Sequence, residues 1–175
     1  LKTKWSNEIK EKSFETYADW PVPQKQCYTS YRFPQYINES ALVVVKSGMD
    51  RLKEFTILYN SGKEQKIYTT GIYKNDRLSY FAGKLVWAEE IPDIRWSNRS
   101  YYCIKTLDII TKKVKTITHK TRLFAPAFSP DGEKIAAVNI TVNNQLSLVI
   151  LNANSGERYE QIQSPQNYVI KDIIW

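Results

Sequence analysis

The side chains that could perform catalysis are few and far apart in this sequence. The chain has one histidine, His119, which we expect to be a loop or packing residue. Nucleophilic hydrolysis needs a base and an oxyanion site, and no GxSxG, HExxH, Walker A or GxGxxG motif occurs. Glu89 and Glu90 are adjacent in a predicted strand, so their carboxylates point to opposite faces. The sequence therefore predicts no catalytic residue and no enzyme activity.

Patterns for metal or cofactor binding are also missing from the sequence. Cys27 and Cys103 are the only cysteines, and neither belongs to a CxxC pair or lies near a histidine-rich set. We expect buried, unpaired thiols, with a single disulfide between them as the alternative. Asp131 is expected to form a turn, because a calcium site needs several oxygen ligands at close spacing. We expect no metal site and no cofactor.

One loop combines residue types that are common in protein interfaces. The stretch 92–100 carries charged, amide and aromatic side chains, namely Asp93, Arg95, Trp96, Asn98 and Arg99. Arginine and tryptophan are enriched among residues that contribute most to binding energy. A cationic pair, Lys120 and Arg122, follows a later predicted strand and is expected to share a face with this loop. Together these residues are our candidate site for a protein or peptide partner.

A purely structural role for the same loop is the alternative. Trp96 would then pack across neighbouring repeats, as aromatic side chains often do in repeat proteins. Arg99 would form an ion pair with Asp93 and brace the loop. Both roles could hold at once.

The charge of the chain does not indicate a nucleic-acid partner. The formal net charge is +7, but lysines recur singly at predicted strand ends and turns, for example Lys46, Lys84 and Lys134. Single charged side chains at strand ends and turns keep sheet edges hydrated and oppose aggregation. No recognition helix or RNA-stacking pattern accompanies them, so we expect no nucleic-acid binding. No stretch approaches the roughly 20 apolar residues of a membrane helix, so we expect no membrane insertion within these residues.

An internal repeat organises most of the chain. The apolar runs ALVVV from Ala41, KLVWA from Lys84 and KIAAV from Lys134 recur at intervals of about 43 to 50 residues. Hairpin-like segments starting at Ile57, Thr106 and Ile150 align after them. The composition, 42% hydrophobic and 13% aromatic, favours half-buried strands. A period of this length that holds four short strands is typical of β-propeller blades.

We therefore predict an all-β fold, a partial β-propeller of about three four-stranded antiparallel blades and the start of another. The expected blades are 26–76, 77–122 with a long loop at 91–100, and 123–167, and residues 168–175 match the first strand of a further blade. Residues 1–25 form either a short helix or the tail of an earlier blade. Propellers close with roughly four to eight blades, so we expect open edges and self-association through them.

The best copy of the repeat contains a tight hairpin signal. Asp131-Gly132 stands between two alternating runs, and glycine tolerates the positive φ that such a turn needs. The segment from Pro126 to Val138, PAFSPDGEKIAAV, resembles the PD40 repeat of tolB-like, WD40-like propellers and of the propeller regions of tricorn and prolyl-oligopeptidase-type peptidases. Equivalent places in the other copies have YFAG, from Tyr80, and YINES, from Tyr36.

A wider resemblance concerns the segment WAEEIPDIRWSNRSYYCIKTLDI, which is similar to part of larger, multidomain tolB-like proteins of Bacteroidetes-type bacteria. Those proteins are usually exported, so the resemblance implies a periplasmic or cell-surface location. The expected function is a non-catalytic propeller that serves as a binding scaffold for protein or peptide. The alternative is the gating or substrate-access propeller of a peptidase whose catalytic domain lies outside these residues.

Overall fold

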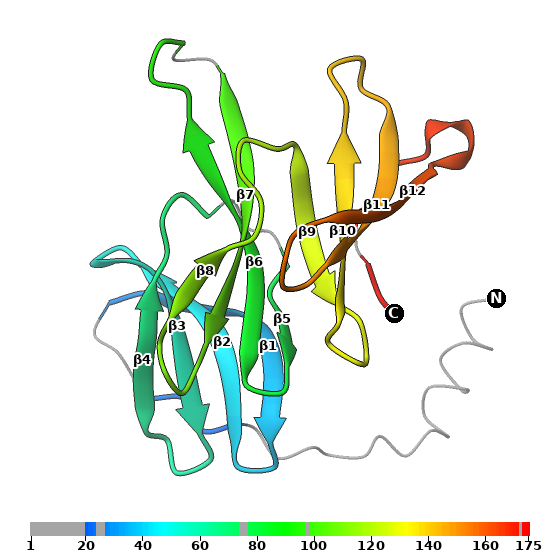
Figure 1. The fold of residues 1–175 in the computed structure, drawn as a ribbon. Helices are drawn as coiled ribbons and strands as arrows, with labels where there is room; N and C mark the ends of the chain where they lie inside the picture. The colour runs from blue at the N-terminus through cyan, green and yellow to red at the C-terminus, as the bar shows by residue number, and fades with distance from the viewer. Residues whose placement is uncertain (1–19, 24–26, 74–76, 97–98, 172) are drawn as a thin grey trace, which may run out of the picture.

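The computed structural model describes residues 20–23, 27–73, 77–96, 99–171 and 173–175, and they form three four-stranded antiparallel sheets (Figure 1). Blade 1 contains β1 (Thr29–Asn38), β2 (Ala41–Gly48), β3 (Arg51–Tyr59) and β4 (Glu64–Thr69). Blade 2 contains β5 (Ser79–Phe81), β6 (Lys84–Pro92), β7 (Ser100–Asp108) and β8 (Val114–Thr116). Blade 3 contains β9 (Leu123–Phe128), β10 (Lys134–Ile140), β11 (Leu146–Asn152) and β12 (Arg158–Gln163).

Each blade is an up-and-down sheet in which strands neighbour one another in sequence order. The three sheets fall inside the three ranges expected from the repeat, and the predicted partial propeller of four-stranded blades is confirmed. The first strands of consecutive blades contact one another, β1 with β5 and β5 with β9. This arrangement places β1, β5 and β9 on the inner side of the arc.

β2, in the middle of blade 1, is apolar on both faces. In β2, Val43 and Val45 belong to the core shared with blade 2, whereas Leu42 and Val44 belong to a cluster on the opposite face. A strand buried on both faces is a continuous apolar run rather than an alternating one. The run ALVVV from Ala41 therefore specifies an internal strand.

Aromatic side chains fill the interface between blades 1 and 2. The rings of Phe55 and Trp87, both fully buried, have centroids 5.0 Å apart in an edge-to-face arrangement. Tyr68 adds a third ring, 5.6 Å from Trp87. Such pairs stabilise a core by roughly 0.5–1.5 kcal/mol beyond the area they bury. Between blades 2 and 3, Phe81 and Phe128 make the corresponding aromatic contact, at 6.3 Å.

The Asp131-Gly132 turn forms as the sequence predicts. The Asp131 carboxylate accepts hydrogen bonds from the Glu133 amide, at 2.9 Å, and from the Ser129 hydroxyl. Gly132 has a φ of +71°, and its amide donates to the Ser129 carbonyl at 2.9 Å. The turn therefore joins β9 to β10 with its polar groups satisfied locally.

Residues 168–175 differ from the expected first strand of another blade. The described residues in this range, 168–171 and 173–175, have no strand conformation. Instead Ile173 is buried against the outer face of blade 3, and the Trp175 indole nitrogen donates to the Ala127 carbonyl at 3.2 Å. A strand needs a neighbour for its backbone groups, and here side chains rather than a ladder hold the segment.

Two other expectations have mixed outcomes. The alternatives for residues 1–25 fall mostly outside the described residues; in 20–23, which are described, there is neither helix nor strand, and Trp20 packs on the outer face of blade 1. Both cysteines are free thiols, as predicted. The predicted burial is correct for Cys103 and wrong for Cys27, which is exposed.

Among the described residues there is no helix with the length and apolarity to cross a membrane.

Candidate binding site at the long loop

The β6–β7 hairpin of blade 2 projects beyond the rest of its sheet. β6 and β7 pair continuously from Lys84 and Asp108 to Pro92 and Ser100, whereas the short flanking strands β5 and β8 pair only with the first part of this ladder. Figure 1 shows the far end of the hairpin standing clear of the neighbouring blades. A projecting hairpin carries its terminal loop into solvent, where a partner can reach it.

Backbone hydrogen bonds shape the loop at the end of this hairpin. The Asp93 amide donates to the Arg99 carbonyl at 2.8 Å, which extends the ladder by one more pair. The Arg99 amide donates to the Trp96 carbonyl at 2.9 Å, and the Asp93 carboxylate accepts from the Arg95 amide at 2.8 Å. The loop is therefore organised by its own polar groups and not by burial.

The described side chains at the tip of the loop, from Ile94 to Trp96, face solvent. Trp96 keeps 65% of its surface exposed and Ile94 is fully exposed. The expectation that Trp96 packs across neighbouring blades is therefore wrong. In the described part of the chain Arg99 forms no ion pair with Asp93; its guanidinium carbon lies 5.1 Å from the centroid of the Tyr101 ring. Cation–π stacking of this kind fixes the guanidinium while leaving its donors free for a partner.

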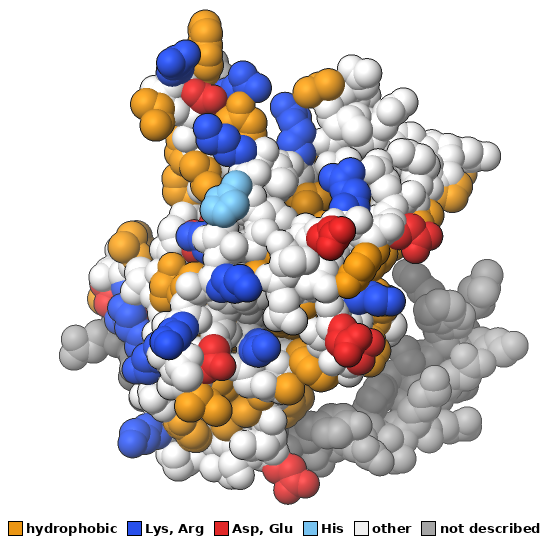
Figure 2. Space-filling model, viewed as in Figure 1, with side chains coloured by type: hydrophobic (Ala, Val, Ile, Leu, Met, Phe, Trp, Pro, Cys, Tyr) orange, Lys and Arg blue, Asp and Glu red, His pale blue; other side chains and the backbone are white. Residues whose placement is uncertain are grey.

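The connection between blades 2 and 3 brings Lys120 to the same place. The amides and carbonyls of Tyr102 and Thr121 exchange hydrogen bonds at 2.7 and 2.8 Å, which ties this connection to β7. One surface cavity of about 400 Å³ is lined by Asp93, Arg95, Trp96, Arg99 and Lys120, together with Ile91 and Ile94. We call this set the long-loop site. In Figure 2, hydrophobic side chains lie beside basic ones at this end of the molecule.

Of the two remaining predicted site residues, one lies elsewhere and the other is not described. Arg122 does not line the cavity; its carbonyl accepts from the Ile140 amide at 3.2 Å, at the end of β10. Asn98 lies outside the described residues. The described lining of the cavity contains three cationic side chains, Arg95, Arg99 and Lys120, and one carboxylate, Asp93. It therefore has an excess of positive charge.

A buried charge pair at the base of the hairpin was not expected from the sequence. Glu89 is 4% exposed; one carboxylate oxygen accepts from the Trp87 indole at 2.8 Å and from the Gly71 amide at 3.1 Å, and the other from the Lys105 ammonium at 2.5 Å. Each oxygen has a donor, so the group stabilises the hairpin and does not await a substrate.

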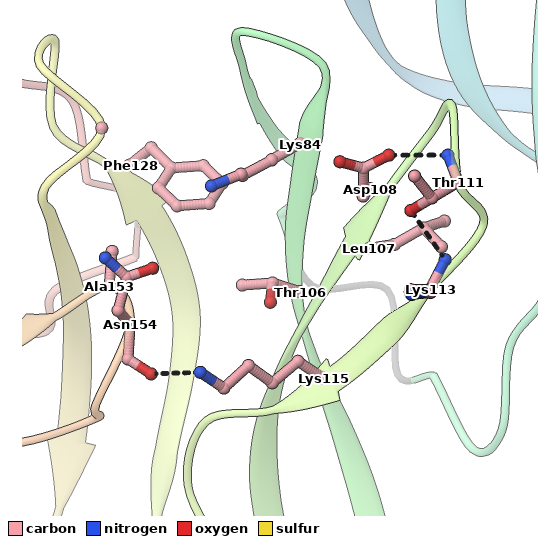
Figure 3. A pocket seen from close by; sticks show the side chains of 11 residues that line it. Lys84, Thr106, Leu107, Asp108, Thr111, Lys113, Lys115, Phe128, Ala153 and Asn154 are labelled. Atoms are coloured by element: carbon pink, nitrogen blue, oxygen red, sulfur yellow. Dashed lines mark hydrogen bonds between the residues drawn. The ribbon is translucent and has the colours of Figure 1, made fainter.

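The described residues contain no group of three His, Cys, Asp or Glu side chains that could hold a metal ion. A second cavity, of about 240 Å³, lies between blades 2 and 3 and is lined by Lys84, Lys113 and Lys115 (Figure 3). In the sequence these lysines appear only as isolated surface charges. Their convergence depends on strand register, which the spacing of lysines alone does not show.

Comparison with known proteins identifies the fold. No protein-family model and no curated protein matches this sequence. Among solved structures, the chain is similar to the β-propeller domain of the Trilobed protease from Pyrococcus furiosus, with 15% identity and a TM-score of 0.50, over 79% of this chain and 44% of that one. A putative TolB from Agrobacterium tumefaciens has 12% identity and a TM-score of 0.52, over 71% of this chain and 42% of that one.

A third similar structure comes from a nidogen/laminin complex, with 11% identity and a TM-score of 0.51, over 71% of this chain and 43% of that one. The chain thus spans less than half the length of each of these three structures. At these identities the likeness defines architecture alone. The described residues form a partial β-propeller of three blades, and its function must be argued from its own surface.

Proposed function

We propose that this chain is a non-catalytic propeller module that binds a protein or peptide through the long-loop site. The observation that carries the proposal is the exposure of Trp96 and Ile94 on a hydrogen-bonded, projecting loop beside the cations Arg95, Arg99 and Lys120. Exposed aromatic and aliphatic side chains beside arginines are the composition of binding hot spots. The excess of positive charge selects a partner segment that combines acidic and apolar residues.

Two similarities support this proposal without assigning it. One similar structure was determined within a nidogen/laminin complex, and another is a putative TolB. Propellers present wide faces built from loops, which suit protein partners. On the basis of these similar structures we also propose that the repeats are of the PD40 type and that the chain is part of a larger exported protein. The module would then work in the periplasm or at the cell surface.

A peptide-display selection on the immobilised chain tests the binding role. We expect enriched peptides that contain acidic and apolar residues, and for these Trp96→Ala should weaken binding by at least about 30-fold, the equivalent of 2 kcal/mol at a hot spot. Arg95→Ala and Arg99→Ala should also weaken peptide binding, and their effect should depend more strongly on salt concentration than the effect of Trp96→Ala. Ile110→Ala is the matched control, because Ile110 is also an exposed aliphatic residue, at 84%, but in the β7–β8 turn. Equal losses in control and site variants would overturn the assignment of the site.

A second candidate is the propeller region of a peptidase, favoured by the similarity to the Trilobed protease propeller over 79% of this chain. In that role the blades would control access to a catalytic domain encoded elsewhere in the same gene. The parent open reading frame tests this directly. A GxSxG nucleophile motif with its acid and histidine partners in a neighbouring domain supports it, and a parent without hydrolase motifs refutes it.

A further inference from the structure

The cavity between blades 2 and 3 lies at the opposite end of the blades from the long-loop site. It is bordered by the turns that follow β7, β9 and β11, represented by Thr111, Gly132 and Asn154. β7 begins beside the long loop and ends at Asp108, which lines this cavity. The two cavities therefore present separate surfaces.

Strand register explains why polar side chains converge here. Lys84 on β6 pairs with Asp108 on β7, and Thr106 on β7 pairs with Lys115 on β8. On the same strand faces, Val86 and Ile104 belong to the apolar core shared with blade 3. The cavity is thus the place where this core ends and a polar row begins along the same face. Figure 3 shows Lys84 and Lys115 extending from blade 2 toward blade 3.

Blade 1 provides an internal comparison, because the same positions can be identified from register. Ala41 pairs with Tyr59 in blade 1 as Lys84 pairs with Asp108 in blade 2. By the same alignment Thr106 corresponds to Ile57. In blade 1 these positions are apolar and pack in the core shared with blade 2. The fold therefore does not require a polar cavity at this place, and blade 2 departs from the pattern of the repeat.

The charges of this cavity are only partly balanced. Asp108 is the one acidic residue among the described residues that line it. Its carboxylate oxygen accepts from the Thr111 and Ile110 amides at 2.7 and 3.0 Å. These bonds, chiefly those from Thr111, lower the pKa of Asp108, so it stays ionised at neutral pH. The described lining thus contains one carboxylate and three lysines.

Lys84 interacts electrostatically with Asp108, but none of the three lysines lies within ion-pair distance of a carboxylate among the described residues. The Lys115 ammonium donates to the Asn154 carbonyl at 2.8 Å, a neutral acceptor on blade 3. In the part of the chain that is described, neither Lys84 nor Lys113 forms an ion pair with a carboxylate. A concave site with surplus ammonium groups and a hydroxyl at Thr106 favours an anion that can accept several hydrogen bonds.

We propose that this inter-blade cavity binds a compact polyanion of the phosphate class. Lysine acts as a point charge with three donors, which suits a tetrahedral phosphate, whereas planar carboxylates are more often held by the arginine fork. A volume of about 240 Å³ accommodates a phosphate or pyrophosphate group. This binding is independent of the long-loop site.

Titration calorimetry of the whole chain at constant ionic strength tests the proposal, with pyrophosphate, inorganic phosphate and phosphoserine as probes and chloride as the balancing ion. We expect pyrophosphate to bind with a Kd of about 1 mM or lower. Tighter binding of phosphoserine than of inorganic phosphate identifies a phosphate ester as the natural source, and the reverse order identifies the free ion. No heat and no thermal shift with any of the three probes refutes the proposal.

Variants then locate the binding. Lys84→Gln and Lys113→Gln should each weaken pyrophosphate binding by at least about fivefold. Lys134→Gln is the matched control, because Lys134 pairs with Asn152 in blade 3 as Lys84 pairs with Asp108, yet it does not line the cavity. Equal weakening in the control means that general surface charge binds the anion, and the site assignment fails.

A final variant separates binding from folding. Thr106→Ile introduces the residue found at the corresponding positions of blades 1 and 3, Ile57 and Ile150, and fills the cavity with an apolar side chain. We expect a thermal midpoint equal to or above that of the wild type, with pyrophosphate binding reduced at least about fivefold. A folded Thr106→Ile variant that binds pyrophosphate with unchanged affinity overturns the proposal.

Discussion

At the scale of single residues, Glu89 is a buried carboxylate, 4% exposed, that depends on its hydrogen-bond donors. Its carboxylate is held by Lys105, Trp87 and the Gly71 amide within the base of the projecting hairpin. A β-carbon on residue 71 would lie 2.9 Å from the Glu89 carboxylate, so glycine is needed for this approach. The pair therefore connects the end of blade 1 to the hairpin that carries the long-loop site.

Removal of Lys105 should destabilise the fold strongly. Lys105→Met leaves a carboxylate that is 5% exposed without its ammonium partner, and a loss of about 3 kcal/mol is expected for breaking such a buried pair. The control is Arg51→Met: Arg51 pairs with Asp50 at 2.6 Å, but the two side chains are 30% and 40% exposed, so the loss should be much smaller. Urea denaturation measures both, and similar losses would contradict the assigned role.

The same pair predicts a dependence on alkaline pH. Burial lowers the pKa of Lys105, but the hydrogen bond and charge of Glu89 raise it more, so the net pKa lies above the ordinary 10.5. A raised folded-state pKa gives stability that is complete below the unfolded-state pKa and is lost as pH rises past the folded value. Wild type should therefore lose more stability than Lys105→Met as pH rises above about 10.4. If the free energies of unfolding of the two proteins fall in parallel as pH rises, the Lys105–Glu89 pair is not the cause of the loss.

At the scale of elements, turns hold the blades together as well as joining strands. Gly132 and Gly156 both have positive φ and both lie against blade 2. A β-carbon at Gly132 would lie 2.2 Å from the Phe81 ring, and one at Gly156 would lie 2.3 Å from the Ile117 carbonyl oxygen. Gly62 has a similar φ of +77° with no atom within 4 Å. Comparing the three glycines therefore distinguishes the cost of a side chain on a left-handed backbone, at Gly62, from the added cost of a clash with blade 2, at Gly132 and Gly156.

Alanine substitutions at these glycines should follow that order. Gly62→Ala should cost about 1 kcal/mol, from the left-handed backbone alone. Gly132→Ala should cost more, because a phenyl ring must move, and Gly156→Ala should cost the most, about 3 kcal/mol, because backbone must move. Chemical denaturation of the three variants measures the series. Equal costs at all three positions would show that contact between the turns and blade 2 contributes little.

The turns and strands were also the elements that the sequence predicted best. The repeat of apolar runs and the Asp131-Gly132 pair depend on local chemistry, namely burial of both strand faces and positive φ, and both appear in the structure. The exposure of Trp96 was not predictable, because a loop tryptophan can either pack between blades or project with its hairpin. The segment 168–175 has strand composition, but pairing depends on a neighbouring strand rather than on composition.

The polyanion cavity shows a different limit of sequence reasoning. Lys84, Lys113 and Lys115 converge only through cross-strand register and the packing of blade 3. One signal was present in the aligned repeats: Thr106 stands where the other copies have Ile57 and Ile150. A polar residue at an apolar position of a repeat marks a place where the packing between neighbours changes, and such substitutions locate sites that motifs do not.

At the scale of the whole molecule, three blades stack as nearest neighbours and leave two outer faces. Blade 1 packs on blade 2 and blade 2 on blade 3, each through its own apolar cluster. The outer face of blade 3 carries Leu148 and Ile150, which are only partly buried and lie with Ile170 and Ile173. In a closed propeller of four to eight blades a further blade covers each such face. The isolated chain thus keeps apolar surface that another blade could bury.

We propose that the 175-residue chain associates with itself through this outer face of blade 3. Light scattering with size-exclusion chromatography should give a mass that rises from monomer toward dimer with increasing concentration. Ile150→Glu should shift the chain toward monomer by roughly tenfold or more in dissociation constant, because association would then bury an unpaired carboxylate in an apolar interface. Ile110→Glu, in an exposed turn, is the control and should leave association unchanged. A chain that remains monomeric at all concentrations would refute the proposal and would mean that the C-terminal residues around Ile173 already cover enough of the face.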